Sequence, residues 1–223
     1  PPRGNIVEFG GGFGFLAKVI YALDFTGAYI IYDLAIVNAL QAFYLRAHGV
    51  KALVHEICPD ILERGAVHLV SSTTVWDQMV SRGLLDQDPT AVFAFYSLSE
   101  APLVLREKFS EPLHRIKTLN TAMIVYAGNF EMTNNVAYFG RWREEMPEWN
   151  VEGKWRHVDR RAEQNYTEGG YMLIAHRELT DVSPTSPATC WSGHTLWDSL
   201  ASWSTQVRGA SLVKHGVPLT MEG

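Results

Sequence analysis

Residues 6–20 read IVEFGGGFGFLAKVI, and this stretch decides the fold. An apolar run that holds one acid, Glu8, meets four glycines within five residues, and an amphipathic run follows at once. The first run predicts a buried strand over Asn5–Phe9, and the second predicts a helix over Gly14–Leu23. A tight turn between a strand and a helix places backbone N–H groups at the start of the helix, beside the carboxyl edge of the sheet. We therefore expect this turn to bind a ligand.

The alternation of strand and helix patterns continues along the chain. Further strands are expected at Ala28–Tyr32, Ala66–Ser71, Ala91–Tyr96, Thr121–Tyr126, Trp155–Val158 and Tyr171–His176, and helices at Leu34–His48, Thr74–Ser81, Pro102–His114 and Asn135–Met146. Gly49 fits a left-handed cap, and Val50–Cys58 fits either a short strand or an irregular segment. Continuous apolar strands separated by helices form parallel sheets covered on both faces. We therefore expect an α/β fold with a mostly parallel, doubly wound sheet and helices on both faces.

Composition excludes several classes of protein. The chain has 223 residues, of which 47% are hydrophobic and 19% charged, as in a globular protein. Its net charge of −5, without a run of Lys or Arg, argues against a nucleic-acid partner. No apolar segment reaches the roughly 18 residues of a membrane span, and we expect neither a signal peptide nor a membrane partner. Cys58 and Cys190 form no metal-ligand pair, so we expect no metal and a cytoplasmic protein.

The sequence changes character after residue 178. Residues 183–187 read SPTSP, which is typical of a linker, and three Trp residues then stand among many Ser and Thr. We expect one domain over residues 1–178 and a tail over residues 179–223, whose structure the sequence does not predict. Because a strand begins by about residue 5, we also expect that an N-terminal part of the domain is missing. The oligomeric state stays open, and a homo-oligomer is compatible with the sequence.

The glycines of the opening stretch distinguish between two ligand classes. The dinucleotide fingerprint G-x-G-x-x-G fails from Gly10, because Phe15 stands at its last glycine, and from Gly11, because Phe13 stands at its second. The pattern E-x-G-x-G-x-G fits instead, with Glu8, Gly10, Gly12 and Gly14 in its fixed positions. In this pattern the stretch resembles the first motif of S-adenosylmethionine-dependent methyltransferases with a Rossmann-like fold. A glycine turn without a ligand is the alternative.

The chemistry of a methionine moiety suits this turn. It offers an ammonium and a carboxylate in place of a pyrophosphate, and glycines let the backbone approach it without a Cβ in the way. Asp33 ends the second strand 23 residues after Gly10, near the spacing of about 20 at which an acid binds a ribose. Asp33 also fits an N-cap of the next helix. Ser71 ends the third strand, where an adenine would lie, and Ser97 follows the fourth at the crevice opposite the glycines.

Longer segments resemble one narrower family. YDLAIVNALQAFYL (32–45), YSLSEAPLVLRE (96–107), FEMTNNVAYFGRW (130–142) and RHVDRRAEQNY (156–166) are similar to sugar O-methyltransferases. The resemblance covers roughly residues 5–176, and it departs from the family where Ala35 replaces a proline. It implies S-adenosylmethionine as cofactor and methyl transfer to a hydroxyl of a sugar or sugar-containing small molecule. Residues 1–178 would then be the cofactor-binding methyltransferase domain.

The resemblance also implies a set of site residues. The cofactor would be bound by Glu8, Gly10, Gly11, Gly12, Phe13, Gly14, Asp33, Ser71 and Ser97. A sugar hydroxyl is a weak nucleophile, so a base is expected, and Glu100 and His157 are the candidates. Glu100 fits a helix cap as well, and His157 could pair with Asp159. Asn134 and Asn135 would orient sugar hydroxyls or form a turn. Two other functions stay open: an NAD-dependent oxidoreductase or epimerase, and a non-catalytic scaffold with a cofactor fold.

Overall fold

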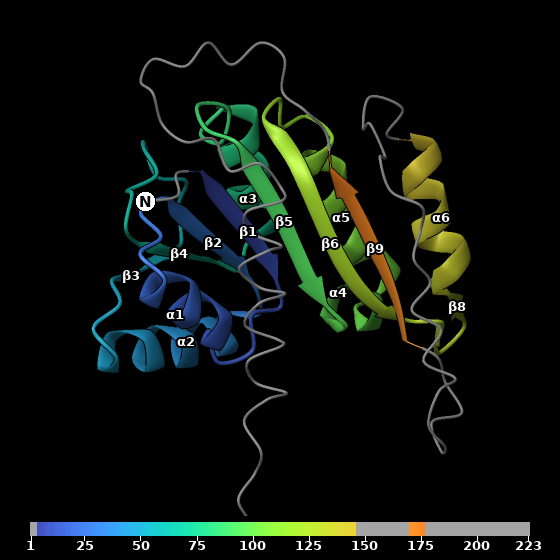
Figure 1. The fold of residues 1–223 in the computed structure, drawn as a ribbon, viewed down its shortest axis with the longest axis horizontal. Coiled ribbons are helices and arrows are strands. Elements are labelled where there is room, and N and C mark those ends of the chain that lie inside the picture. Colours follow the sequence, from blue (N-terminus) through green and yellow to red (C-terminus); the bar gives the residue numbers. More distant parts are fainter. Residues whose placement is uncertain (1–3, 146–169, 177–223) are drawn as a thin grey trace, which may run out of the picture. The chain divides into compact units, whose positions relative to one another are not determined.

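A seven-stranded sheet organises the part of the chain that the computed structural model describes, residues 4–145 and 170–176 (Figure 1). Its strands are β1 (Asn5–Phe9), β2 (Ala28–Tyr32), β3 (Ala52–His55), β4 (Val67–Val70), β5 (Thr90–Phe95), β6 (Leu119–Ala127) and β9 (Gly170–His176). They lie in the order β3-β4-β2-β1-β5-β6-β9. All neighbours are parallel except β9, which runs antiparallel to β6. The expected strand Trp155–Val158, His157 and the tail over residues 179–223 lie outside the described residues.

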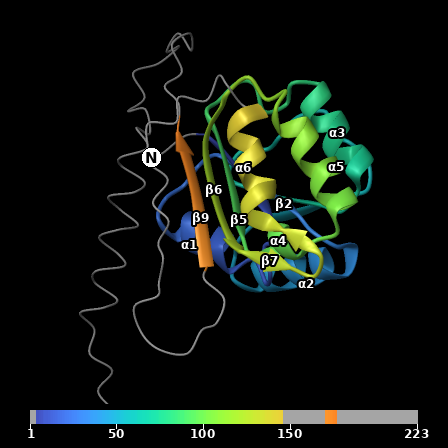
Figure 2. The ribbon, with the colours of Figure 1, turned by 90° about the vertical axis from the view of Figure 1, so that its right-hand side faces the viewer.

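Helices cover both faces of this sheet. They are α1 (Phe15–Ala22), α2 (Ala35–Ala47), α3 (Thr73–Ser81), α4 (Ser97–Glu100), α5 (Leu103–Leu113) and α6 (Asn135–Glu145). Tyr21 of α1 contacts Tyr29 of β2, whereas Trp76 of α3 and Phe109 of α5 contact Tyr32, whose side chain points to the other face. Figure 2 shows α3, α5 and α6 together on that second face. The expected mostly parallel, doubly wound α/β fold is therefore confirmed.

Most element boundaries lie within one or two residues of the expectation, and the differences have local causes. The ambiguous segment after Gly49 forms the edge strand β3, and Gly49 takes the predicted left-handed conformation with φ 76°. The third expected strand ends at Val70 instead of Ser71, and Ser72 accepts a hydrogen bond from Val75 N as the N-cap of α3. The short helix α4 and the ribbon β7 (Asn129–Phe130) with β8 (Thr133–Asn134) were not expected.

An aromatic cluster supports the carboxyl ends of the two central strands. Phe9 and Tyr32, the last residues of β1 and β2, both pack on Phe109, with ring centroids 4.8 and 5.5 Å apart. Trp76 stacks on the same ring at 5.4 Å, and its indole N–H donates to the carbonyl of Phe109 at 3.0 Å. Each such aromatic pair contributes about 0.5–1.5 kcal/mol beyond its buried area. This packing holds the carboxyl ends of β1 and β2 in place, and with them the backbone from which the glycine turn and Asp33 continue.

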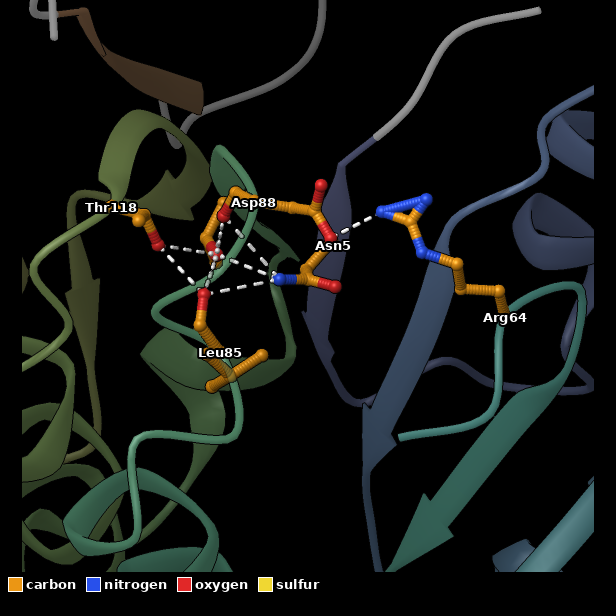
Figure 3. A network of polar contacts seen from close by, with 6 residues as sticks. Asn5, Arg64, Leu85, Asp88 and Thr118 are labelled. Atoms are coloured by element: carbon orange, nitrogen blue, oxygen red, sulfur yellow. Dashed lines mark hydrogen bonds and ion pairs between the residues drawn. The ribbon is translucent and has the colours of Figure 1, made fainter. Parts of the chain in front are cut away.

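A polar network joins strands of the sheet at their amino ends, on the side away from the carboxyl ends just described (Figure 3). The Asn5 side-chain amide donates to the carbonyl oxygens of Leu85 at 3.2 Å and Asp88 at 3.4 Å, and the Thr118 hydroxyl donates to Leu85 at 2.7 Å. The Asp88 carboxylate forms an ion pair with Arg64. These contacts tie the starts of β1, β5 and β6 together, far from the carboxyl ends.

Among the described helices, none has the length and apolar character needed to cross a membrane.

Candidate cofactor site at the carboxyl edge

Three glycines of the turn after β1 are favoured by close packing, by a positive φ, or by both. A Cβ on Gly10 would lie 2.3 Å from the Cβ of Ser97, and Gly10 has φ 72°. A Cβ on Gly11 would lie 2.8 Å from the side chain of Ile31. Gly14, with φ 84°, lies against Leu45 of α2, whose side chain would be 3.2 Å from a Cβ. These glycines let the turn pass between β2, α2 and the end of β5.

Gly12 differs from the other glycines of the turn. It has φ 54°, a left-handed conformation that L-residues rarely adopt, yet a Cβ built on it would meet no described atom within 4 Å. Protein packing therefore does not exclude a side chain at this position. The open space beside Gly12 is where a ligand could approach the backbone closely.

Glu8 lies behind the turn as a buried carboxyl group. Its side chain is 4% exposed, and its Oε2 accepts a hydrogen bond from the Tyr29 hydroxyl at 2.9 Å. Burial raises the pKa of Glu8 to about 7, with a smaller contribution from the nearby charge of Asp33, and the hydrogen bond from Tyr29 opposes the rise. Burial therefore favours the neutral form of Glu8, and a neighbouring cation would favour its charged form.

Asp33 follows β2 at the same edge. Its Oδ1 accepts a hydrogen bond from Leu34 N at 2.8 Å, and its Oδ2 accepts one from the Gln41 side chain at 2.9 Å. Burial raises the pKa of Asp33, while hydrogen bonds from Leu34, Gln41 and the Gly11 N–H lower it. The N-cap of α2 is Leu34, so Asp33 lies one residue outside the cap position. The alternative role of Asp33, as the N-cap of α2, is therefore wrong.

Gln41 of α2 was missed by the sequence reasoning. Its side chain is fully buried, and its amide nitrogen donates to the Gly12 carbonyl oxygen and to Asp33 Oδ2, each at 2.9 Å. The available signal was the stretch over residues 32–45, in which Gln41 comes eight residues after Asp33. Two helical turns of α2 bring a side chain at that spacing back over the end of β2.

The segment after β5 packs against the start of the glycine turn. Tyr96 has φ 63° and ψ −42°, and its carbonyl oxygen accepts hydrogen bonds from Ser99 N, Ser99 Oγ and Glu100 N at 2.8, 2.6 and 3.1 Å. Such a conformation costs a bulky residue about 1–3 kcal/mol and is found where the surroundings hold it. Ser97 Oγ donates to the carbonyl of Phe9 at 2.6 Å, which joins the ends of β5 and β1.

Comparisons with known proteins concern the fold alone. No protein-family model matches the chain, and no curated protein matches its sequence. Among solved structures, the chain is similar to the methyltransferase domain of bacterial CtHen1, with 13% identity, a TM-score of 0.48, and coverage of 78% of this chain and 90% of that chain. It is also similar to TrmK from M. capricolum, solved with S-adenosylhomocysteine, with 7% identity, a TM-score of 0.47, and coverage of 96% and 84%. An O-methyltransferase family 2 protein from Planctomyces limnophilus, solved with apigenin, has 10% identity, a TM-score of 0.42, and coverage of 78% and 51%.

The strand order, with its antiparallel last strand, identifies the architecture. This is a Rossmann-like methyltransferase fold. In open α/β sheets, ligands bind in the crevice beyond the carboxyl ends of the strands, at the point where the strand order reverses. In this chain that point lies between β1 and β5, because β1 leads to β2 on one side and pairs with β5 on the other. The glycine turn, Asp33 and Ser97 all lie at this edge of the methyltransferase fold.

A buried arginine holds the segment after β5. Arg106 of α5 is 1% exposed and donates to the carbonyl oxygens of Ala101 at 2.6 Å and Ser99, and to Asn135 Oδ1 at 2.6 Å. Burial lowers the pKa of the guanidinium, and the Tyr138 ring lies against it with the guanidinium carbon 5.3 Å from the centroid. The two carbonyl groups flank Glu100, so Arg106 fixes the backbone on both sides of that residue.

Asn135 is an internal residue of this methyltransferase fold. Its side chain is fully buried and donates to the carbonyl oxygens of Ser99 at 3.3 Å and Ala127 at 2.9 Å, in addition to accepting from Arg106. The expectation that Asn135 orients sugar hydroxyls is therefore wrong. Asn134, the last residue of β8, accepts a hydrogen bond from Ala137 N at its Oδ1 at 3.0 Å, so it caps the start of α6.

The remaining expected site residues have different positions. Ser71 is exposed just beyond the end of β4, and Glu100 is exposed at the end of α4, both at the carboxyl edge. Phe13 of the glycine turn is 62% exposed. Of the two base candidates, Glu100 lies at this edge, and His157 lies outside the described residues. In the described ranges, no three His, Cys, Asp or Glu side chains are grouped in a way that could hold a metal ion.

Proposed function

We propose that this chain is an S-adenosylmethionine-dependent methyltransferase that acts on a hydroxyl group of a small, sugar-like molecule. The observation that carries the proposal is Gly12, which is left-handed and has open space where a side chain would stand, in a turn whose preceding residue, Gly11, lies beside the acids Glu8 and Asp33. A ligand with cationic groups suits two carboxylates, whereas a pyrophosphate would be repelled by them.

The residues of the turn fit the cofactor. The backbone of Gly12 would let the methionine moiety approach, Glu8 would attract its ammonium, and Asp33 would accept a hydrogen bond from a ribose hydroxyl. A carboxylate offers about four acceptor positions, and the three described N–H partners of Asp33 leave about one of them for the ligand. When bound, the cofactor would supply a methyl group attached to a positively charged sulfur. The rest of the cofactor would leave as a neutral thioether, which is a good leaving group.

The chain's own residues would align the acceptor and take its proton. Glu100 is our candidate for the base at the carboxyl edge, because it is exposed there and Arg106 holds the carbonyl groups on both sides of it. His157 stays a second candidate from the sequence. The sugar-like acceptor follows from the resemblance of residues 32–45, 96–107 and 130–142 to sugar O-methyltransferases.

The test is calorimetric titration of the chain with S-adenosylhomocysteine, with NAD as the parallel ligand. We expect micromolar binding of S-adenosylhomocysteine and none of NAD. The variant Gly12→Ala should bind at least tenfold more weakly, because its Cβ would enter the open space beside the turn. Gly49→Ala is the matched control: Gly49 is also left-handed, with φ 76°, and also has no described atom within 4 Å of a built Cβ.

The control separates blocked binding from backbone strain. Both variants place an L-residue in the left-handed region, at a cost of about 1–2 kcal/mol to folding. If Gly49→Ala weakens binding as much as Gly12→Ala, the loss comes from strain, and Gly12 does not mark the site. Binding of NAD alone would make the chain an oxidoreductase or epimerase instead. Binding of S-adenosylhomocysteine without methyl transfer to any hydroxylated acceptor would favour a scaffold.

A further inference from the structure

The two halves of the candidate site come from chain segments that separate after the sheet ends. β1 and β2 pair in register up to Phe9 and Tyr32, and Gly10 N extends the pairing with a bond of 2.9 Å to the carbonyl of Tyr32. Beyond that point the glycine turn leads into α1, while Asp33 leads into α2. Sheet pairing therefore does not set the distance between Gly12 and Asp33.

Gln41 supplies a second connection, in addition to the bond from the Gly11 N–H to the Asp33 carboxylate. Its side-chain amide has two N–H donors, and the two recorded bonds, to the Gly12 carbonyl oxygen and to Asp33 Oδ2, are both 2.9 Å long. Gln41 is fully buried, whereas its two acceptors lie nearer the surface, and one of the two bonds is strengthened by the charge of its acceptor. One side chain thus joins the turn after β1 to the acid after β2.

The bond to Gly12 also orients a peptide group. In a planar trans peptide the carbonyl oxygen and the following N–H point in opposite directions. Because the Gly12 oxygen points to Gln41, the N–H of Phe13 points to the other side of the turn. Leu45, one helical turn after Gln41, packs against Gly14 and fixes α2 over the same turn.

We infer that Gln41 is a positioning residue of the cofactor site, which holds the Asp33 carboxylate and the Gly12–Phe13 peptide in the geometry that binds the nucleoside and methionine ends of one ligand. This inference rests on the proposed function, because it assumes that the ligand is S-adenosylmethionine. A glutamine suits the role since it carries two donors on a side chain long enough to reach both acceptors. Glutamate lacks the donors when ionised, and asparagine is shorter by one methylene group.

The test replaces Gln41 by Leu and measures the affinity of the full chain for S-adenosylhomocysteine by calorimetry. We expect the dissociation constant to rise at least tenfold. Asn38→Leu is the matched control, because Asn38 is 1% exposed, lies one turn earlier on α2, and has no hydrogen-bond partner for its side chain among the described residues. We expect this variant to bind within twofold of the parent chain.

Two readouts distinguish positioning from a general structural role. In a double-mutant cycle, Asp33→Asn should weaken binding less in the Gln41→Leu background than in the parent chain, since Gln41 acts partly through Asp33. In a ¹³C NMR titration without ligand, Gln41→Leu should raise the pKa of Asp33, which keeps the Leu34 and Gly11 donors. The same spectra report the pKa of the neighbouring carboxyl group of Glu8, on β1.

The outcomes separate this inference from the proposed function. If the parent chain does not bind S-adenosylhomocysteine, the proposed function fails, and this inference fails with it. If the parent chain binds and Gln41→Leu binds equally well, only the inference is overturned. The same holds if Asn38→Leu weakens binding as much as Gln41→Leu, because the effect then belongs to the packing of α2. Additive effects of the substitutions at positions 33 and 41 would also overturn it.

Discussion

Replacing Glu8 by Gln should stabilise the ligand-free protein at alkaline pH. The buried carboxyl group has its pKa raised from 4.5 to about 7. Between these two pH values the folded chain holds a proton that the unfolded chain has released, so the free energy of unfolding falls as pH rises. Each pKa unit corresponds to about 1.4 kcal/mol, so the loss amounts to about 3 kcal/mol above pH 7. Glutamine stays neutral at every pH and can still accept the hydrogen bond from Tyr29.

The assay is urea denaturation of the ligand-free chain at several pH values between 5 and 8. Glu8→Gln and the parent chain should be similar in stability near pH 5, and the variant should be more stable by about 3 kcal/mol at pH 8. Glu111→Gln, which removes an exposed charge from α5, controls for net charge and should follow the parent chain. A stability difference that does not change with pH, or a variant less stable than the parent at pH 8, would refute the reasoning.

The same substitution should act in the opposite direction on ligand binding. Glu8 is proposed to meet the ammonium of the cofactor, and a hydrogen bond to a charged group contributes about 1.5–3 kcal/mol. We therefore expect Glu8→Gln to bind S-adenosylhomocysteine about 10- to 100-fold more weakly while folding more stably. A charge that destabilises the empty site would then be retained for its ligand.

Two further predictions concern the segment after β5. Tyr96→Gly should be more stable than Tyr96→Ala by about 1 kcal/mol in urea denaturation, because φ at this position is 63° and only glycine adopts it freely. At most positions alanine is the more stable of the two residues. A more stable Ala variant at position 96 would show that Tyr96 is not strained. Arg106→Met should lower the free energy of unfolding by about 3 kcal/mol or more, because the Ser99 and Ala101 carbonyl oxygens and the Asn135 side chain lose a buried donor. A loss below 1 kcal/mol, measured in the same way, would mean that water or another group replaces the guanidinium.

The sequence allowed prediction of the fold where the signal is local. The continuous apolar strands Asn5–Phe9 and Ala28–Tyr32 lie in the centre of the sheet with the expected bounds, because residues buried on both faces leave no other pattern. The position of Asp33 was predictable for a related reason: the carboxyl ends of parallel strands meet at one edge. The four-residue strand β3 was ambiguous, because an edge strand is only half-buried.

Contacts between distant segments could not be predicted in the same way. The bond from Gln41 to Gly12 joins residues 29 positions apart, and the bond from Arg106 to Asn135 also spans 29. The sequence alone does not distinguish a buried glutamine or arginine from an exposed one. The positive φ of Tyr96 could not be predicted from the sequence either, because the Ser99 and Glu100 groups that donate to its carbonyl oxygen reach it only once the turn has formed.

The order of the strands in the sheet has a consequence for synthesis. β1 is made early, but one of its two neighbours, β5, ends at Phe95, and Gly10 meets Ser97 only after that. At about 5–20 residues per second, a ribosome needs several seconds to add the residues between them. The central strand therefore waits with one edge unpaired, and the cofactor edge is assembled late. A bound ligand can thus stabilise the finished chain, but it has no complete site to bind before Ser97 has been added to the nascent chain.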